Sequence, residues 1–324
     1  MTDRNIFVYI ETAGGEPVKV GLEMLTPARE AAGGGKVTAV IIDGQADHAA
    51  EEALRYGADN VIAAACDAAP PENTVGVLSL MAGKYGPDVI MIGSTPAGRE
   101  TAPRLAARLG AGCITDVNAL TVTDDGIVWT TPLFGGTILE KSGVKTDVQV
   151  VTIRSGAFKR SEVRDTAGGG ITNEEITLQE SGVKTKIIDS VVEISEQVNL
   201  EDAEIIVTGG KGMGTEEDFL KISELADVLG ATVGATRPVI EAGWASRAHQ
   251  VGQSGKIVSP KLYIAFGVSG ATQHLTGMVG SDYIVAVNKD EDAPIFEVAD
   301  IGIVGDAKKV LPIFIEECRK LKNE

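Results

Sequence analysis

The sequence predicts an α/β protein of two domains, each with a mostly parallel β-sheet flanked by helices. Two observations carry this prediction. Short β-branched runs alternate with helix-like stretches in the first half of the chain, and the same alternation starts again in the second half. The length of 324 residues suits two domains, since one domain usually holds about 100–200 residues. We place the domains at residues 1–190 and 191–324.

The first half predicts a parallel sheet. Its expected strands are Ile6–Ile10, Val37–Ile42, Asn60–Ala63 and Val89–Gly93. The expected helices between and after them are Pro17–Ala31, His48–Tyr56, Glu72–Tyr85 and Arg99–Leu109. Strands that are joined through helices of this length form right-handed βαβ units, which build parallel sheets.

The pattern changes after these units. The runs Ile114–Val122, Gly126–Thr131 and Asp147–Arg154 have no helices between them, so we expect an antiparallel addition to the sheet. The polar, glycine-rich passage Ser155–Glu180 follows and predicts a linker between the domains.

The second half returns to alternating strands and helices. Its expected strands are Glu204–Thr208, Ala231–Ala235, Leu262–Phe266, Tyr283–Asn288 and Ile301–Val304. The expected helices are Glu216–Leu229 and Lys308–Leu321. A unit of about 130 residues with this alternation is typical of nucleotide-binding domains.

Composition excludes several classes of function. The net charge of −17 argues against nucleic acid and anionic membranes as partners, and is compatible with solubility or an acidic docking face. The three cysteines, Cys66, Cys113 and Cys318, lie far apart, so we expect no metal cluster and no disulfide framework, and a cytoplasmic location. We also expect no signal peptide and no membrane-spanning segment.

A glycine-rich loop, Gly209–Gly214, lies between an expected strand and an expected helix. Backbone N–H groups in such a loop suit a pyrophosphate. The dinucleotide fingerprint fails, however, because Thr215 breaks its spacing and Ala231–Ala235 offers no carboxylate for a ribose. A tight turn that needs glycine for positive φ is the alternative, and the loop alone does not decide between them.

Further segments at strand-to-helix junctions are rich in small residues, amides and hydroxyls. They are Gly234–Pro238, Gln250–Lys256, Gly267–His274 and Asn288–Asp290. Such loops can approach a planar ring closely and bond its edges, whereas an acid–base or hydrolytic enzyme would gather carboxylates, a nucleophile or a metal shell. We therefore expect no catalytic residue and no metal site. The cationic members are Arg237, Lys256 and His274.

These segments resemble the FAD domain of electron-transfer flavoprotein α subunits. The resemblance is dense from Ile205 to the end of the chain, at Gln250–Val258, Leu262–Ala265, Gly267–His274, Val285–Asp290, Ala293–Phe296 and Val298–Asp300. It is weaker in the first half, at Ala97–Ala106, Pro132–Gly136 and Arg154–Phe158. Together these segments span nearly the whole chain.

The resemblance implies a Rossmann-like second domain that binds FAD, and a set of FAD-binding residues. These are Lys211, Thr236, Arg237, Gln250, Val251, Gly252, Gln253, Ser254, Gly255, Ser269, Gly270, Ala271, Thr272, Gln273, His274, Asn288, Asp306 and Ala307. By resemblance, Thr236 and Arg237 lie beside the isoalloxazine ring and Val251–Ser254 along its N5 edge. Ser269–His274 follows the pyrophosphate and ribityl chain, with His274 near N1 and the C2 carbonyl. The adenosine end falls to Asn288 and Asp306.

Taken singly, several of these residues have plainer interpretations. Arg237 alone predicts a solvated surface charge, and His274 alone predicts a cap on a carbonyl. Asp306 suits an N-cap for the last helix, and Asn288–Asp290 suits a turn. Lys211 stands where the family usually has arginine, which keeps the charge but loses the planar fork for phosphate.

The function implied by the resemblance is that of an electron carrier whose protein tunes a flavin. We expect His274 and Arg237 to stabilise negative charge on the reduced flavin. Ser254, where many members have threonine, is expected to hydrogen-bond N5.

The implied partners are a β subunit that contacts the first domain and an acyl-CoA dehydrogenase or a related flavoenzyme. NADH-dependent electron bifurcation, with enzymatic NADH oxidation and a second FAD in the β subunit, stays open. So do two alternatives, a stand-alone NAD-dependent oxidoreductase and a nucleotide-sensing module.

Overall fold

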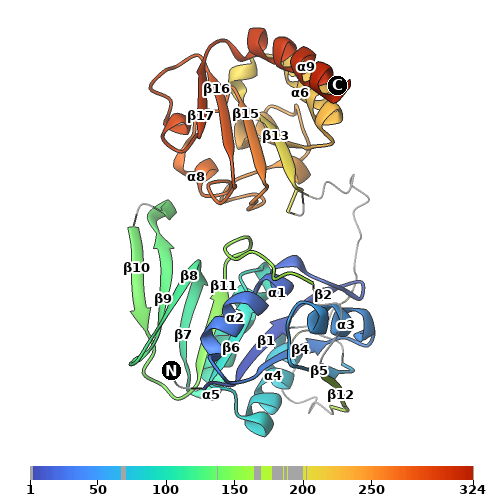
Figure 1. Ribbon diagram of the computed structural model, residues 1–324, viewed down its shortest axis with the longest axis vertical. Helices are drawn as coiled ribbons and strands as arrows, with labels where there is room; N and C mark the ends of the chain where they lie inside the picture. Colours follow the sequence, from blue (N-terminus) through green and yellow to red (C-terminus); the bar gives the residue numbers. More distant parts are fainter. Residues whose placement is uncertain are drawn as a thin grey trace. The chain divides into compact units, whose positions relative to one another are not determined.

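Two parallel β-sheets organise the chain, one in each of two units, Met1–Val191 and Val192–Glu324 (Figure 1). The structure is a computed structural model that describes residues 3–66, 71–136, 138–163, 169–176, 185, 188, 200–201 and 203–323. The predicted domain boundary between residues 190 and 191 lies outside the described residues.

The first unit is built on a seven-stranded parallel sheet with the order β12-β5-β4-β1-β6-β11-β7. The strands are β1 (Ile6–Ile10), β4 (Val37–Ile42), β5 (Asn60–Ala64), β6 (Val89–Gly93), β7 (Gly112–Val117), β11 (Gln149–Ile153) and β12 (Gly170–Glu174). Strand β1 is buried on both faces, with Ile6, Val8 and Ile10 in one core cluster and Phe7 and Tyr9 in the other. Such a strand is an unbroken apolar run, which is why its bounds could be predicted.

Helices cover both faces of this sheet. On one face lie α1 (Lys19–Glu23), α2 (Leu25–Ala32) and α3 (Asp47–Arg55), and on the other lie α4 (Pro71–Tyr85) and α5 (Pro96–Leu109). The single helix predicted over Pro17–Ala31 is therefore wrong. Pro27 has no N–H for the carbonyl of Glu23, and its ring crowds that carbonyl, so the helix divides at Met24.

The predicted antiparallel addition is confirmed only in part. Strands β8 (Ala119–Thr123), β9 (Gly126–Leu133) and β10 (Ile138–Gly143) form an antiparallel sheet. The flanking strands β7 and β11 instead pair in parallel within the main sheet, contrary to the prediction. Parallel neighbours need a crossover connection, and the three-stranded sheet provides it in place of a helix. A short hairpin of β2 (Thr12–Ala13) and β3 (Glu16–Pro17) completes the unit.

The passage Ser155–Glu180, which was predicted to be a linker, contains a strand of the first sheet. Its segment Gly170–Glu174 is β12, an edge strand that pairs in parallel with β5. Glu174 accepts hydrogen bonds from Lys84 and Tyr85 of α4, the former at 2.6 Å. The prediction failed here because an exposed edge strand carries no apolar pattern that marks its partner. Residues 164–168 and 177–180 of this passage lie outside the described residues.

The second unit has a five-stranded parallel sheet in the order β14-β13-β15-β16-β17. Its strands are β13 (Ile205–Gly209), β14 (Thr232–Ala235), β15 (Leu262–Phe266), β16 (Ile284–Asn288) and β17 (Ile301–Val304). Helices α6 (Glu216–Leu229) and α9 (Ala307–Asn323) pack together on one face (Figure 1). The other face is covered by the segment around Val251, by α8 (Thr272–Leu275) and by η5 (Pro294–Glu297).

Candidate functional site

A pocket of about 490 Å³ lies in the second unit, among the loops that follow β13, β14 and β15. This is the carboxyl edge of a parallel sheet, where open α/β folds collect their ligands. The pocket has the size of a typical cofactor site. It is lined by Gly210, Lys211, Gly212, Thr236, Arg237, Pro238, Gln250, Val251, Gly252, Gln253, Ser254, Gly267, Val268, Ser269, Gly270, Ala271, Gln273 and His274.

Most of the residues that the resemblance implied come together in this pocket. Those that line it are Lys211, Thr236, Arg237, Gln250, Val251, Gly252, Gln253, Ser254, Ser269, Gly270, Ala271, Gln273 and His274. Lining residues that were not predicted are Gly210, Gly212, Pro238, Gly267 and Val268. They lie inside the segments Gly209–Gly214, Gly234–Pro238 and Gly267–His274, which the sequence singled out, but the resemblance did not give them a role at the cofactor.

The other predicted residues do not line the pocket. The Asn288 side chain at the end of β16 donates to the Val268 carbonyl at 2.8 Å and so supports the loop behind the pocket. Asp306 accepts from the N–H of Lys308 at 3.1 Å, as an N-cap of α9 does, and Ala307 is buried in the core. Gly255 lies in the loop from Gln250 to Lys256, and Thr272 lies at the start of α8. Direct contact of these residues with the cofactor stays a prediction.

The glycine-rich loop after β13 packs against the loop after β15. The N–H of Gly212 donates to the Gly267 carbonyl at 3.0 Å, and a Cβ on Gly210 would lie 2.2 Å from the same oxygen. Gly267 itself has a φ of +63°, a conformation that disfavours other residues. Glycine is thus required for this close approach, and Gly210 and Gly212 also form part of the pocket wall. Within the loop, Gly214 has a φ of +86°, as the interpretation as a tight turn expects, whereas contact of the loop with a pyrophosphate stays a prediction.

A second loop, from Gln250 to Lys256, is held to the strand and helix beside it. The N–H of Val251 donates to Ala235 at 3.0 Å, and the N–H of Gln253 donates to Gln273 at 2.7 Å. Gly255 closes the loop with an N–H bond to the Gly252 carbonyl at 2.9 Å. Thr272 is the first residue of α8, and its carbonyl accepts a hydrogen bond at 2.8 Å from the side chain of Thr276, which directly follows the helix.

Ser254 is prepared to donate a hydrogen bond. The buried Gln250 side chain donates its amide N–H to Ser254 Oγ at 2.9 Å. Since that oxygen already accepts one bond, the hydroxyl proton remains for another acceptor.

His274 is neutral at pH 7, although it was counted among the cationic residues of these segments, and its expected effect on the reduced flavin stays a prediction. Burial lowers the pKa of His274 to about 4, although its bond to the Val251 carbonyl acts in the opposite direction. Its Nδ1 lies 3.1 Å from the Val251 carbonyl oxygen, and its Nε2 lies 3.0 Å from the hydroxyl of Tyr263.

The positive charge at the pocket comes from Lys211 and Arg237. Lys211 Nζ lies 3.5 Å from the centre of the Trp244 ring, a cation–π contact. Arg237 is exposed and donates to Glu241 at 2.8 Å. Lys256 does not line the pocket, and its Nζ lies 3.3 Å from a carboxylate oxygen of Glu201. None of the described residues that line the pocket is acidic, so an anionic ligand is favoured.

Metal-binding clusters and membrane-spanning helices are both absent from the described part of the chain. No cluster of His, Cys, Asp and Glu there is suited to a metal ion. Among the described helices, none combines the length and apolar character that crossing a membrane requires.

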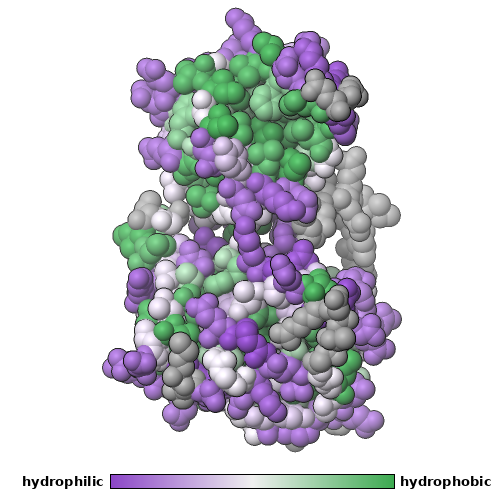
Figure 2. Space-filling view, viewed as in Figure 1, coloured by the Kyte–Doolittle hydropathy of each residue, from purple (hydrophilic) through white to green (hydrophobic). Residues whose placement is uncertain are grey.

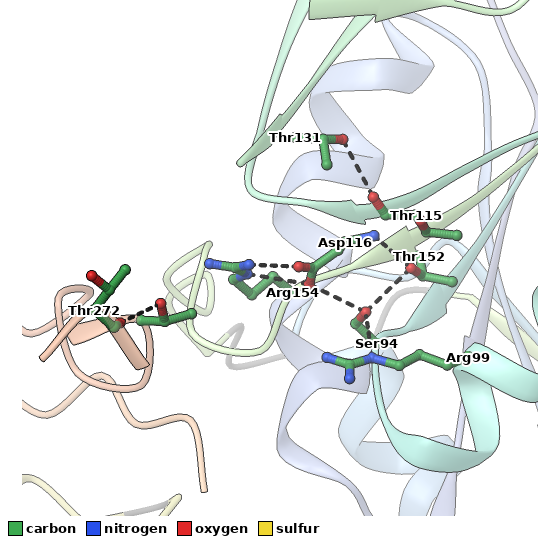
Figure 3. Close-up of polar contacts among 9 residues, drawn as sticks. Ser94, Arg99, Thr115, Asp116, Thr131, Thr152, Arg154 and Thr272 are labelled. Atoms are coloured by element: carbon green, nitrogen blue, oxygen red, sulfur yellow. Dashed lines mark hydrogen bonds and ion pairs between the residues drawn. The ribbon is translucent and has the colours of Figure 1, made fainter. Parts of the chain in front are cut away.

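A polar cluster lies in the first unit, at the carboxyl ends of the parallel strands β7 and β11 (Figure 3). Asp116 has a φ of +61°, in the left-handed region, where β7 shifts register against β11. Its carboxylate receives bonds from Arg154 at 3.2 and 2.5 Å, and its N–H donates to Thr152 at 2.8 Å. Ser94 adds a weaker bond at 3.4 Å. The guanidinium of Arg154 thus holds the side chain of a residue whose backbone has an unfavourable conformation.

Comparison with known proteins decides the family. The model of the electron transfer flavoprotein domain matches residues 6–178, and that of the electron transfer flavoprotein FAD-binding domain matches residues 199–279. An electron transfer flavoprotein subunit alpha from Thermoanaerobacterium thermosaccharolyticum is 43% identical, over 98% of this chain and 99% of that protein. The chain belongs to the electron transfer flavoprotein α-subunit family.

Other relatives carry the same name. The proteins of Megasphaera elsdenii and Bacillus subtilis are 40% and 38% identical to this chain. The alignment covers 99% of this chain and 98% of the first protein, and 98% of both chains for the second. The predicted family is therefore confirmed over almost the full length.

The second unit of this α-subunit family member contains the FAD-binding domain, so the predicted cofactor is confirmed. The residues of the pocket fit FAD. Glycine backbones, hydroxyls, amides and two cations suit a dinucleotide with two phosphates and a planar ring. This match favours the flavin over the alternative of a stand-alone NAD-dependent oxidoreductase.

Proposed function

We propose that this chain is the α subunit of a heterodimeric electron carrier that holds FAD in the second-unit pocket. In this proposal it shuttles electrons between a flavin dehydrogenase, such as an acyl-CoA dehydrogenase, and an acceptor. The observation that carries the proposal is the convergence of the predicted residues on one pocket that has two cations and no acidic lining residue among those described.

The bound FAD would supply the redox chemistry, and the chain would bind and orient it. Lys211 and Arg237 provide positive charge for its phosphates and for the ring. The Ser254 hydroxyl, whose oxygen accepts a bond from Gln250, would have its O–H available to donate a hydrogen bond to the N5 edge of the flavin. The glycine backbones let the loops approach closely, and neutral His274 closes the inner wall.

A binding titration tests this proposal. The purified chain should be yellow, release FAD on denaturation, and bind one FAD. Lys211→Ala and Arg237→Ala should each weaken FAD binding by roughly 10- to 100-fold, since each removes a charge-assisted bond of about 1.5–3 kcal/mol. Lys256→Ala is the matched control and should bind as the parent does, because Lys256 pairs with Glu201 instead. A colourless protein whose fluorescence responds to NAD would contradict the proposal.

The first unit is proposed to contact the β subunit. Support comes from β10, an edge strand whose neighbourhood exposes Phe134, Ile138 and Leu139 by 76%, 52% and 59%. Apolar atoms gather over the end of β10 in Figure 2. An exposed apolar edge strand is a site for pairing with another chain.

Leu139→Arg should therefore weaken the heterodimer at least tenfold. It places a charge in an apolar contact, and the loss of that contact should cost more than about 1 kcal/mol of binding free energy. Sedimentation of the complex at several concentrations measures this. Ile313→Arg on α9 is the control, because Ile313 is 63% exposed and lies in the second unit. Equal dissociation constants for both variants would rule out β10 as the contact.

The bifurcating version of this function requires a second FAD in the β subunit. A flavin count on the purified complex and its reduction by NADH distinguish it from a simple carrier. The proposal keeps the cytoplasmic location that the cysteine usage predicts.

A further inference from the structure

Tyr263 is a buried polar residue that does not line the pocket. It lies in β15, the central strand of the second sheet, and its side chain is completely buried. Its hydroxyl is 3.0 Å from Nε2 of His274, and the two rings are 6.2 Å apart at an angle of 55°. His274 lines the pocket and Tyr263 lies behind it.

The partners of His274 decide where its proton lies. The Val251 carbonyl can only accept a hydrogen bond, so Nδ1 of His274, 3.1 Å away, must carry the proton. A neutral imidazole then has a bare Nε2, which can only accept. The Tyr263 hydroxyl therefore donates to it, and each ring nitrogen has one partner of the right kind.

Three separate elements hold these partners in place. Tyr263 is fixed by the parallel pairing of β15 with β13 and β16. Val251 is fixed by its N–H bond to Ala235 at 3.0 Å, and the backbone of His274 by its N–H bond to Ala271 at 2.8 Å. A ring bonded at both nitrogens to rigid elements has one orientation and one tautomer.

We propose that Tyr263 is a positioning residue that holds His274 as the neutral Nδ1–H tautomer, with both nitrogens turned to protein partners and no N–H offered to the pocket. The His274 ring is thus an uncharged part of the pocket surface with one fixed orientation. The low pKa of His274 agrees with this geometry. The part of the inference that concerns the cofactor rests on the proposed function, and the part that concerns the tautomer does not.

Nitrogen NMR of the unliganded chain tests the tautomer directly. The chain has three histidines, so a ¹⁵N-histidine-labelled sample gives few signals. At neutral pH, His274 should show a protonated Nδ1 and a bare Nε2. Tyr263→Phe should move the Nε2 signal toward that of an unbonded acceptor and leave Nδ1 in place. His249 is the internal control, because its Nδ1 lies 2.8 Å from the Val233 carbonyl and Tyr263 does not contact it.

Two results would overturn the tautomer assignment. One is a ¹⁵N signal showing that His274 of the parent protein is protonated at Nε2, and this result requires no variant. The other is an Nε2 signal that does not respond to Tyr263→Phe. Both measurements are made without FAD, so they stand even if the proposed function fails.

A double-mutant cycle with FAD tests whether Tyr263 acts through His274. Tyr263→Phe should weaken FAD binding about fivefold, because the His274 ring that it releases must be ordered again on binding, and should shift the flavin midpoint potential. In a His274→Ala background the same substitution should cause no further shift of the potential. A merely structural Tyr263 would shift the potential equally in both backgrounds, and that result would refute the positioning role.

Discussion

At the scale of single residues, the environment decides the charge of a side chain in this protein. His274 and Arg237 are both basic and both line the pocket, but the first is 7% exposed and neutral whereas the second is exposed. The residue types were predictable from the sequence. Burial is a property of the packed fold, so the neutral state of His274 was not predictable.

The low pKa of His274 makes the stability of the unliganded chain depend on pH. Between its ordinary pKa of 6.5 and its folded pKa of about 4, only the unfolded chain binds the proton, so stability falls as the pH decreases. His274 alone should reduce the free energy of unfolding by about 2 kcal/mol between pH 7.5 and pH 5.

Urea denaturation of the parent and of His274→Gln at both pH values measures this effect. The glutamine variant removes the titrating group, so its loss of stability over the same interval should be about 2 kcal/mol smaller. Identical pH dependence in the two proteins would show that folding does not lower the pKa of His274.

At the scale of elements, strands and helices followed local patterns, and their pairing did not. Pro27 divides a predicted helix into α1 and α2, because it lacks the N–H that would continue the helix. This signal is present in the sequence itself. The parallel pairing of β7 with β11 leaves no local trace, because the residues between them form a separate antiparallel sheet. The same holds for β12 at the far edge.

The register shift in β7 places Asp116 under backbone strain that Arg154 offsets. Asp116→Ala should destabilise the protein by about 3 kcal/mol, because it removes charge-assisted bonds from a mostly buried arginine and keeps a side chain at positive φ.

Asp116→Gly is the matched variant. It loses the same bonds but tolerates the left-handed backbone, so it should be more stable than the alanine variant by about 1 kcal/mol. Chemical denaturation of both variants measures the difference. A glycine variant no more stable than the alanine variant would show that the backbone at Asp116 is not strained.

At the scale of the whole molecule, the pocket lies within one of the two units. Every residue that lines the pocket belongs to the unit Val192–Glu324, which has its own sheet and its own core. A domain with its own core can fold alone. The second unit should therefore carry the cofactor by itself.

A fragment of residues 192–324 should bind FAD, whereas a fragment of residues 1–191 should not. Absorbance of the flavin after gel filtration measures this, and circular dichroism checks that each fragment is folded. A folded second fragment that stays colourless in excess FAD would show that the first unit or a partner completes the site.

The sequence by itself determined the fold class, most strand positions in both units, the family and the segments that form the pocket. These follow from local composition and residue order, which the chain carries without folding. Only the tertiary structure decided that β7 and β12 join the main sheet, that Lys256 pairs away from the pocket, and that Tyr263 holds a neutral His274. Each of these depends on residues distant in sequence that become neighbours, and on burial, which changes the energy of a charge.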